Sequence, residues 1–168
     1  MVQYLMHENY SYWKYNPEFI TEILGYLRRY KVLEIFAGNG YLASLLNEGG
    51  IHITSTTRFS SHDGHQFGMH FPVIEMEASQ AIKEYGEQSD ILLMSWPTVT
   101  EEVINAVRLW GTKPFLFIGE ITNYSKNELG GCATDRFFEE TVFYKKFKTY
   151  RGNYIEKAVM GRLRKSCI

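Results

Sequence analysis

The sequence is poor in cysteine and has no long apolar run, no internal repeat and no low-complexity linker. The spacing of its two cysteines, Cys132 and Cys167, fits neither a metal site nor a C-x-x-C motif, so we expect reduced thiols and a cytoplasmic chain without disulfides. No apolar stretch approaches the roughly 18 residues that a membrane span requires. The first residues contain no basic segment followed by an apolar run, so we expect no secretion signal.

A strong net charge is also missing. The formal net charge is −1, which argues against a protein that binds nucleic acid over its whole surface. The cations are nevertheless concentrated near the C-terminus, where Glu156 is the single acidic residue among Lys145, Lys146, Lys148, Arg151, Lys157, Arg162, Arg164 and Lys165. Two interpretations of this basic C-terminal region stay open: a solvated strand face with a basic tail, or a patch that contacts a polyanion.

What the chain does contain is apolar and aromatic residues, which make up 45% and 15% of the sequence. This is the composition of a packed globular protein, and 168 residues is a usual length for one domain. We therefore predict a single domain over residues 1–168. It would combine an N-terminal aromatic segment and helix, in residues 1–30, with an α/β core in residues 31–168.

Signals for strands and helices alternate along the chain. Short apolar or β-branched runs predict strands at residues 31–36, 51–56, 73–77, 91–95 and 114–119. Capping residues and helical periodicity predict five helices. The first begins at Pro17 after Asn16, and the second and third cover residues 41–47 and 78–85. The fourth runs from a Thr98-x-x-Glu101 capping box to residue 110, and the fifth covers residues 135–144. Residues 147–150 and 155–163 are expected to form a closing antiparallel pair.

Strands that alternate with helices form a mostly parallel sheet with helices on both of its faces. With an antiparallel strand near the C-terminus, the predicted fold class is Rossmann-like α/β. Ligands of such sheets bind beyond the carboxyl ends of the strands. This rule brings four segments around one crevice, at residues 34–40, 56–58, 77–78 and 95–98.

A glycine turn follows the first predicted strand at once. The G-x-G-x-x-A pattern at residues 38–43 lets a ligand approach the backbone, and the next helix offers free N–H groups. The spacing also fits a dinucleotide fingerprint, and Arg58 could accept the 2′-phosphate of NADP. The carboxylate of Glu34 and the bulk of Tyr41 disfavour a pyrophosphate. An acidic side chain there suits a cationic ligand and favours S-adenosylmethionine, while a Rossmann-like fold without a cofactor stays a third alternative.

Six segments, taken in order, carry a resemblance to a known family. They are Tyr10-Ser11-Tyr12, residues 33–41 with Glu34-Ile35-Phe36-Ala37-Gly38-Asn39-Gly40, Glu75-Met76-Glu77-Ala78, residues 92–97, Phe117-Ile118-Gly119-Glu120, and Gly131-Cys132-Ala133-Thr134-Asp135. This set resembles the class I S-adenosylmethionine-dependent methyltransferases, and in particular a small, poorly characterised group with a Trp-Pro pair. The resemblance spans about residues 10–164 and implies the methyltransferase fold and S-adenosylmethionine as cofactor.

The resemblance also implies roles for individual residues. The cofactor-binding set is Glu34, Phe36, Ala37, Gly38, Asn39 and Gly40 for the methionine end, Thr57 for the ribose, Glu77 and Ala78 for the adenine, and Tyr12 from the N-terminal segment. Thr57 departs from the family, which usually has an acidic residue there, and a hydroxyl binds less strongly than a charge-assisted carboxylate. Ser95, Trp96 and Pro97 occupy the position of the catalytic motif of many amino-methyltransferases.

Two polar and aromatic clusters remain. The aromatic residues before the first helix are interpreted as a lid over the cofactor or as packing against the sheet edge; they are Tyr10, Tyr12, Trp13 and Tyr15. The loop after the second strand contains His62, Asp63, His65 and His70. No second Cys or His pair completes a metal site with these residues, so we predict no metal.

The sequence thus predicts an S-adenosylmethionine-binding protein that transfers a methyl group to an unidentified acceptor and makes no membrane contact. Two other functions stay open: a non-catalytic interaction protein that retains the fold, and an NADP-linked oxidoreductase. The leading hypothesis depends on Glu34, whose carboxylate must face the open end of the sheet.

Overall fold

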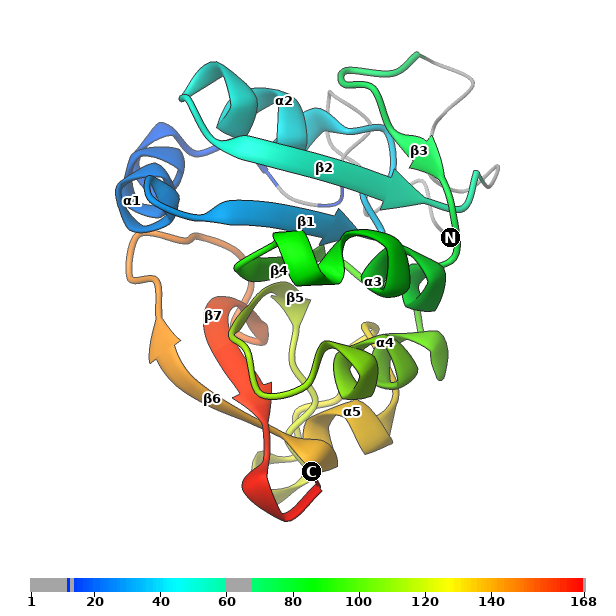
Figure 1. Ribbon diagram of the computed structural model, residues 1–168. Helices are drawn as coiled ribbons and strands as arrows, with labels where there is room; N and C mark the ends of the chain where they lie inside the picture. The colour runs from blue at the N-terminus through cyan, green and yellow to red at the C-terminus, as the bar shows by residue number, and fades with distance from the viewer. Residues whose placement is uncertain (1–11, 13, 60–67, 168) are drawn as a thin grey trace.

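The computed structural model describes residues 12, 14–59 and 68–167, and a seven-stranded sheet forms its centre (Figure 1). In sheet order the strands are β3 (Ile74–Glu75), β2 (His52–Thr57), β1 (Lys31–Ile35), β4 (Ile91–Ser95), β5 (Phe115–Glu120), β7 (Glu156–Leu163) and β6 (Thr141–Lys146). Neighbouring strands pair in parallel except where β7 meets β5 and β6, so β7 alone among the described strands runs against the rest. The mostly parallel sheet with an antiparallel C-terminal strand is therefore confirmed.

The strand order reverses between β1 and β4. These strands are hydrogen-bonded neighbours, although β2 and β3 lie between them in the sequence. In an open parallel sheet the crevice at such a reversal is where ligands bind. The topology therefore points to the carboxyl ends of β1 and β4.

Five α-helices in the described part of the chain cover the two faces of the sheet. Helices α1 (Pro17–Leu27) and α2 (Tyr41–Glu48) pack on one face, while α3 (Ala78–Tyr85), α4 (Glu102–Trp110) and α5 (Asp135–Glu140) pack on the other. Short 3₁₀ turns lie at Gly86–Gln88, Tyr124–Lys126 and Lys165–Cys167. Each face thus has its own hydrophobic core.

Side chains along β1 alternate between these two cores. Leu33 and Ile35 pack with α3 and α4, whereas Val32 packs with α1 and α2. Because a strand covered on both faces buries every side chain, β1 has a nearly continuous apolar sequence. Glu34 is the exception, since it carries a carboxyl group at a position that is only 1% exposed.

Helix α1 begins where the sequence predicts. The Asn16 side-chain oxygen accepts a hydrogen bond from the Glu18 amide at 3.1 Å, and Pro17 occupies the first turn, where a missing N–H leaves no bond unmade. The Asn16 amide group also donates to the Thr149 carbonyl at 2.7 Å. This bond ties the start of α1 to the chain that follows β6.

Three predicted boundaries are wrong. The helix expected at residues 135–144 ends at Glu140, and the chain continues as β6, which is paired with β7 along its length. Residues 147–150 consequently form no strand. The expected Thr98-x-x-Glu101 capping box is not made, because α4 begins at Glu102, and the Thr100 hydroxyl accepts from the Glu102 amide at 3.3 Å.

Within the described residues, no helix combines the length and the apolar character needed to cross a bilayer. Cys132 is buried, Cys167 is exposed, and both thiols are free.

Candidate functional site

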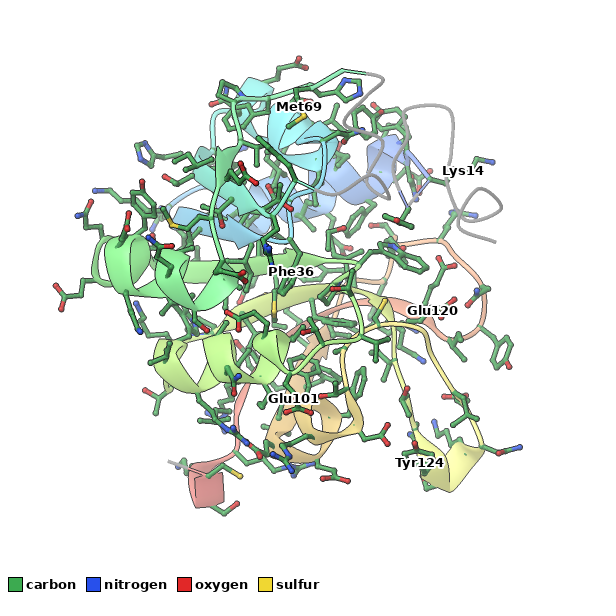
Figure 2. All side chains as sticks on the ribbon, turned by 90° about the vertical axis from the view of Figure 1, so that its right-hand side faces the viewer. Lys14, Phe36, Met69, Glu101, Glu120 and Tyr124 are labelled. Atoms are coloured by element: carbon green, nitrogen blue, oxygen red, sulfur yellow. The ribbon has the colours of Figure 1, made fainter. Side chains whose placement is uncertain are left out.

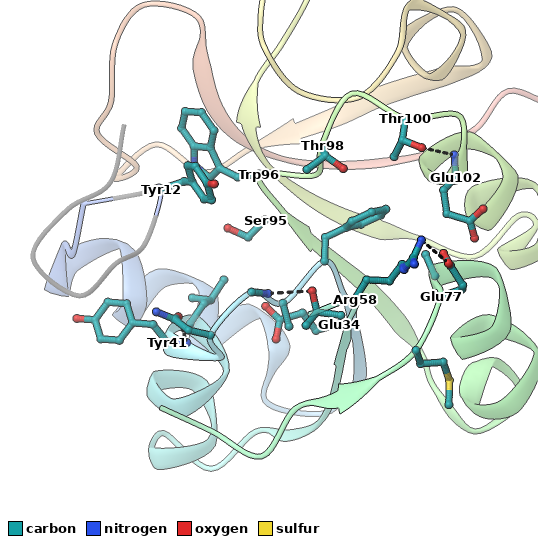
Figure 3. Close-up of a pocket in the computed structure, with 18 residues that line it drawn as sticks. Tyr12, Glu34, Tyr41, Arg58, Glu77, Ser95, Trp96, Thr98, Thr100 and Glu102 are labelled. Atoms are coloured by element: carbon teal, nitrogen blue, oxygen red, sulfur yellow. Dashed lines mark hydrogen bonds and ion pairs between the residues drawn. The ribbon is translucent and has the colours of Figure 1, made fainter. Parts of the chain in front are cut away.

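A pocket with a volume of about 240 Å³ lies at the carboxyl ends of β1, β2 and β4, on the edge of the sheet that faces the viewer in Figure 2. Its wall combines strand ends, the turn before α2 and the starts of α3 and α4 (Figure 3). The lining residues are Tyr12, Glu34, Phe36, Ala37, Gly38, Asn39, Tyr41, Leu42, Thr57, Arg58, Met76, Glu77, Ala78, Ser95, Trp96, Thr98, Thr100 and Glu102.

Glu34 faces this pocket from near the end of β1. The Ser55 hydroxyl, its register neighbour on β2, donates a hydrogen bond to Glu34 Oε2 at 2.7 Å. Burial raises the pKa of the Glu34 carboxyl from 4.5 to about 8, because desolvation disfavours the charged form more than the Ser55 hydrogen bond favours it. Burial therefore favours the neutral acid at Glu34, and a cationic group bound beside it would favour the carboxylate.

The turn after β1 has an unusual backbone. Phe36 and Gly38 both have a φ of 58°, in the left-handed region. This conformation is unfavourable for Phe36 because it has a Cβ, and it is accessible to Gly38, which has none. The Ala37 amide donates to the Thr56 carbonyl at 3.0 Å, and the Gly38 amide donates to the Thr57 hydroxyl at 3.4 Å. These two bonds hold the turn against the end of β2 and keep it along the pocket wall.

Gly40 lies at the back of this turn. It is not among the residues that line the pocket. Its φ is 78°, and a Cβ there would lie 2.8 Å from the Phe71 Cβ. The missing side chain thus makes room for Phe71 behind the turn.

Trp96 forms the wall of the pocket at the end of β4. Its φ is 51°, again in the left-handed region, and its amide donates to the Ile118 carbonyl at 2.6 Å. The Tyr12 ring stacks on the indole with a centroid distance of 5.9 Å. Pro97 does not line the pocket; its carbonyl accepts from the Ala133 amide at 3.1 Å. Of the expected catalytic trio, only Ser95 and Trp96 therefore reach the cavity.

The far end of the pocket contains an ion pair that the sequence did not predict. Arg58 follows β2, Glu77 precedes α3, and their side chains lie 2.9 Å apart (Figure 3). Glu102 is a second acid there, and its Oε1 accepts from the Ser79 amide at 2.8 Å. A phosphate placed on Arg58 would compete with the Glu77 carboxylate that already neutralises it.

The structure brings most of the predicted site residues together. Every member of the predicted set lines the pocket except Gly40 and Pro97. Four further residues line the pocket without having been predicted, because each comes from a helix or connection whose direction only the fold defines: Leu42, Met76, Thr100 and Glu102. His62, Asp63, His65, Tyr10 and Trp13 lie outside the described residues, and within those residues no cluster of metal-ligating side chains occurs.

No protein-family model matches this sequence, and neither does any curated protein sequence. Solved structures do match. MtNAS in complex with S-adenosylmethionine gives a TM-score of 0.59 at 12% identity, over 87% of this chain and 60% of that one. Mitomycin 7-O-methyltransferase MmcR gives 0.56 at 12% identity, over 88% and 53%. The glycopeptide N-methyltransferase MtfA, complexed with sinefungin, gives 0.53 at 11% identity, over 86% and 92%.

These similarities define the fold. The chain has the Rossmann-like α/β fold of the class I methyltransferases, as its sequence predicts. It spans 60% of the length of MtNAS and most of the length of MtfA. Membership of the smaller Trp-Pro group stays a prediction.

Proposed function

We propose that this protein binds S-adenosylmethionine and transfers its methyl group to an acceptor. The observation that carries the proposal is the buried Glu34 carboxyl, which faces a pocket at the strand-order reversal. The charged form of a buried carboxyl group is stabilised by a cationic group of a ligand. S-adenosylmethionine supplies an ammonium and a sulfonium on one short chain, next to a flat nucleoside.

The pocket offers a matching group for each part of this ligand. Glu34 and the backbone of residues 36–39 would hold the methionine end, with the carboxylate accepting from the ammonium. Thr57 would bind a ribose hydroxyl, and Glu77 and Ala78 would lie beside the adenine. Tyr12 would cover the ligand from the Trp96 side, where the two rings already stack. The fold supports this assignment, since MtNAS and MtfA are described with S-adenosylmethionine and sinefungin.

Methyl transfer needs little acid–base help from the protein. A lone pair on the acceptor attacks the methyl carbon, the carbon–sulfur bond breaks toward sulfur to give a thioether, and the acceptor releases a proton. The protein has to align the acceptor and exclude water. Ser95, the last residue of β4, and Trp96, which follows it, both line the pocket. Ser95 would align the acceptor by a hydrogen bond, and the Trp96 ring would stack against it.

The rival functions predict different ligands. An NADP-linked oxidoreductase would use Arg58 for the 2′-phosphate, but that guanidinium is paired with Glu77 at 2.9 Å. A non-catalytic protein with this fold would bind S-adenosylmethionine weakly or without turnover, consistent with a threonine at position 57. We further propose that the basic C-terminal residues contact a polyanion.

Calorimetric titration at pH 8 tests the cofactor. Wild type should bind S-adenosylmethionine and S-adenosylhomocysteine and should not bind NADPH. Glu34→Gln should bind S-adenosylmethionine at least about tenfold more weakly, because a charge-assisted hydrogen bond contributes about 1.5–3 kcal/mol. Glu48→Gln, the same change at an exposed position on α2, should bind as wild type does. No heat with millimolar S-adenosylmethionine would refute the proposal.

Turnover is measured separately. Cell extract incubated with the protein and S-adenosylmethionine carrying a labelled methyl group should acquire label, and Trp96→Ala should reduce the amount transferred. Binding without transfer to any extract would favour the non-catalytic alternative.

A further inference from the structure

We propose that a second surface, formed by the end of α1 and the strands β6 and β7, binds single-stranded nucleic acid. The surface consists of three tyrosines and the cations beside them. Its members are Tyr26, Tyr30, Tyr144, Arg28, Arg29, Lys145 and Arg162, and we call it the tyrosine–cation surface.

Contacts join the three tyrosines, Lys145 and Arg162 in a row, and Arg28 and Arg29 directly precede Tyr30 in the sequence. The Arg162 guanidinium lies 5.9 Å from the Tyr144 ring centroid, and the Lys145 ammonium lies 5.6 Å from that of Tyr26. The Tyr26 and Tyr30 rings are 6.3 Å apart. Tyr144 is the last member of the row. Burial raises the pKa of Tyr26, and the nearby phenols of Tyr144 and Tyr30 raise it further. In Figure 1, α1 and the end of β6 both lie at the left of the view, and the Lys145–Tyr26 contact joins them.

The row is accessible. Tyr30 is 43% exposed and Tyr144 is 52% exposed. The four cations Arg28, Arg29, Lys145 and Arg162 are exposed as well. Tyr26 is half-buried because it packs edge-on against Phe147 at 5.4 Å, which anchors the row to the core.

The charge of this surface is not neutralised by the protein. The ion pairs found in the described part of the chain use Arg58, Arg108, Arg136 and Arg151, and none uses a cation of the tyrosine–cation surface. An anion that approaches here therefore has no internal carboxylate to displace. Lysines on β6 also protect an edge strand from pairing with another sheet, but that role does not account for the arginines at the end of α1 or for the exposed rings.

Exposed rings between free cations match one class of polyanion best. Single-stranded nucleic acids are held by cations that follow the phosphates and by aromatic rings on which successive bases stack. A polyanion without bases would use the cations and ignore the rings. A duplex hides its base faces, so it would also gain nothing from the tyrosines.

The test is fluorescence anisotropy with a labelled 12-nucleotide single strand at 50 mM salt, with a duplex of the same length and heparin as competitors. We expect micromolar binding of the single strand, and a log–log salt slope of up to about −2.8 if all four cations contact phosphates. Lys145→Ala/Arg162→Ala should weaken binding at least about tenfold. Lys83→Ala/Lys126→Ala, which removes two exposed lysines elsewhere, should leave it unchanged.

The tyrosines distinguish the sources of binding. Tyr30→Phe/Tyr144→Phe should retain most of the affinity, since phenylalanine still stacks. Tyr30→Ala/Tyr144→Ala should weaken single-strand binding at least about fivefold, because base–aromatic stacking contributes that much per ring, and should leave heparin binding unchanged. Equal losses for both ligands, a preference for the duplex, or no binding at 50 mM salt would overturn the proposal. The variants lie outside the pocket, so calorimetry with S-adenosylmethionine reports independently on the proposed function.

Discussion

Replacement of Glu34 by glutamine tests the electrostatics of the pocket with little change in shape. Burial raises the pKa of this carboxyl from 4.5 to about 8. Glutamine has nearly the shape of a protonated glutamate, and its Oε1 can still accept the hydrogen bond from the Ser55 hydroxyl. The substitution therefore removes the titration and leaves the packing in place.

The sign of the effect follows from where the proton is bound. Between about pH 4.5 and pH 8 the unfolded chain has lost the Glu34 proton while the folded protein retains it. The stabilisation is complete below pH 4.5 and is lost as the pH rises through 8. Each unit of pH in this window removes about 1.4 kcal/mol, and the whole window amounts to roughly 4–5 kcal/mol.

Urea unfolding of the ligand-free protein from pH 5 to pH 9 measures this directly. The free energy of unfolding of wild type should fall by about 1.4 kcal/mol per pH unit relative to Glu34→Gln. Above pH 8 the variant should be the more stable protein. Glu48→Gln provides the control and should follow wild type at every pH. Parallel curves for wild type and Glu34→Gln would show that the carboxyl is not desolvated and would remove the basis for its role.

Ligand binding should show the opposite pH dependence. A bound ammonium requires the ionised carboxylate, so the affinity for S-adenosylmethionine should rise by up to about tenfold per pH unit between pH 6 and pH 8. Above about pH 8 the ligand itself loses its ammonium proton, since free α-amino groups titrate at about 7.7–8.0. The affinity of wild type should thus peak near pH 8, and that of Glu34→Gln should lack the rising limb.

Three further predictions follow from single contacts. Gly40→Ala should lower the free energy of unfolding by about 1–3 kcal/mol, because its φ is 78° and the new methyl would meet Phe71, whereas Gly25→Ala, with open space on α1, should be neutral or stabilising in the same urea titration. Trp96→Phe should reduce the change in tryptophan fluorescence on addition of S-adenosylmethionine, since Trp96 lines the pocket whereas Trp110 is buried in the core. Arg108→Gln should destabilise the protein at pH 7 and have no effect in acid, because Arg108 lowers the pKa of Glu140 and this stabilisation is lost as the pH falls through that lowered value; Lys83→Gln is the control, and a pH-independent effect would contradict the assignment.

The fold could be predicted because its signals are local and repeat. The run at residues 91–95 is apolar throughout, as a strand covered on both faces must be, and the structure places it as β4. The glycine turn before α2 fixed the position of the first strand and of the crevice beyond it. With those elements, the parallel order and the ligand edge follow from general rules of α/β folds.

The C-terminal part was harder because tertiary pairing decides its structure. Residues 135–144 contain no glycine or proline, and they favour a helix by sequence alone. The helix nevertheless ends at Glu140, since the following residues pair with β7, and the Thr141 hydroxyl donates to the Phe137 carbonyl at the boundary. Pairing with a strand whose partner residues lie 13 to 22 positions further on leaves no local signal at the boundary.

The far end of the site escaped prediction for a related reason. Arg58, Glu77 and Glu102 are separated in the sequence, and only the packing of α3 beside α4 brings them to one pocket. The charge state of Glu34 was equally hidden, because its pKa depends on complete burial and not on the residue type. Sequence can identify an acid at the right strand, but whether it is charged is a property of the folded protein.

The two central strands end in the same unusual way, and this favours a functional pocket over a structural hollow. Phe36 after β1 and Trp96 after β4 both adopt a left-handed backbone, at φ values of 58° and 51°, and both line the cavity. Such conformations are unfavourable by about 1–3 kcal/mol for bulky residues and persist where the surrounding structure enforces them. Here the enforcing hydrogen bonds run from the Ala37 amide to the Thr56 carbonyl and from the Trp96 amide to the Ile118 carbonyl. Both strained positions therefore carry an aromatic ring on the pocket wall, and strained backbone of this kind is concentrated at ligand sites.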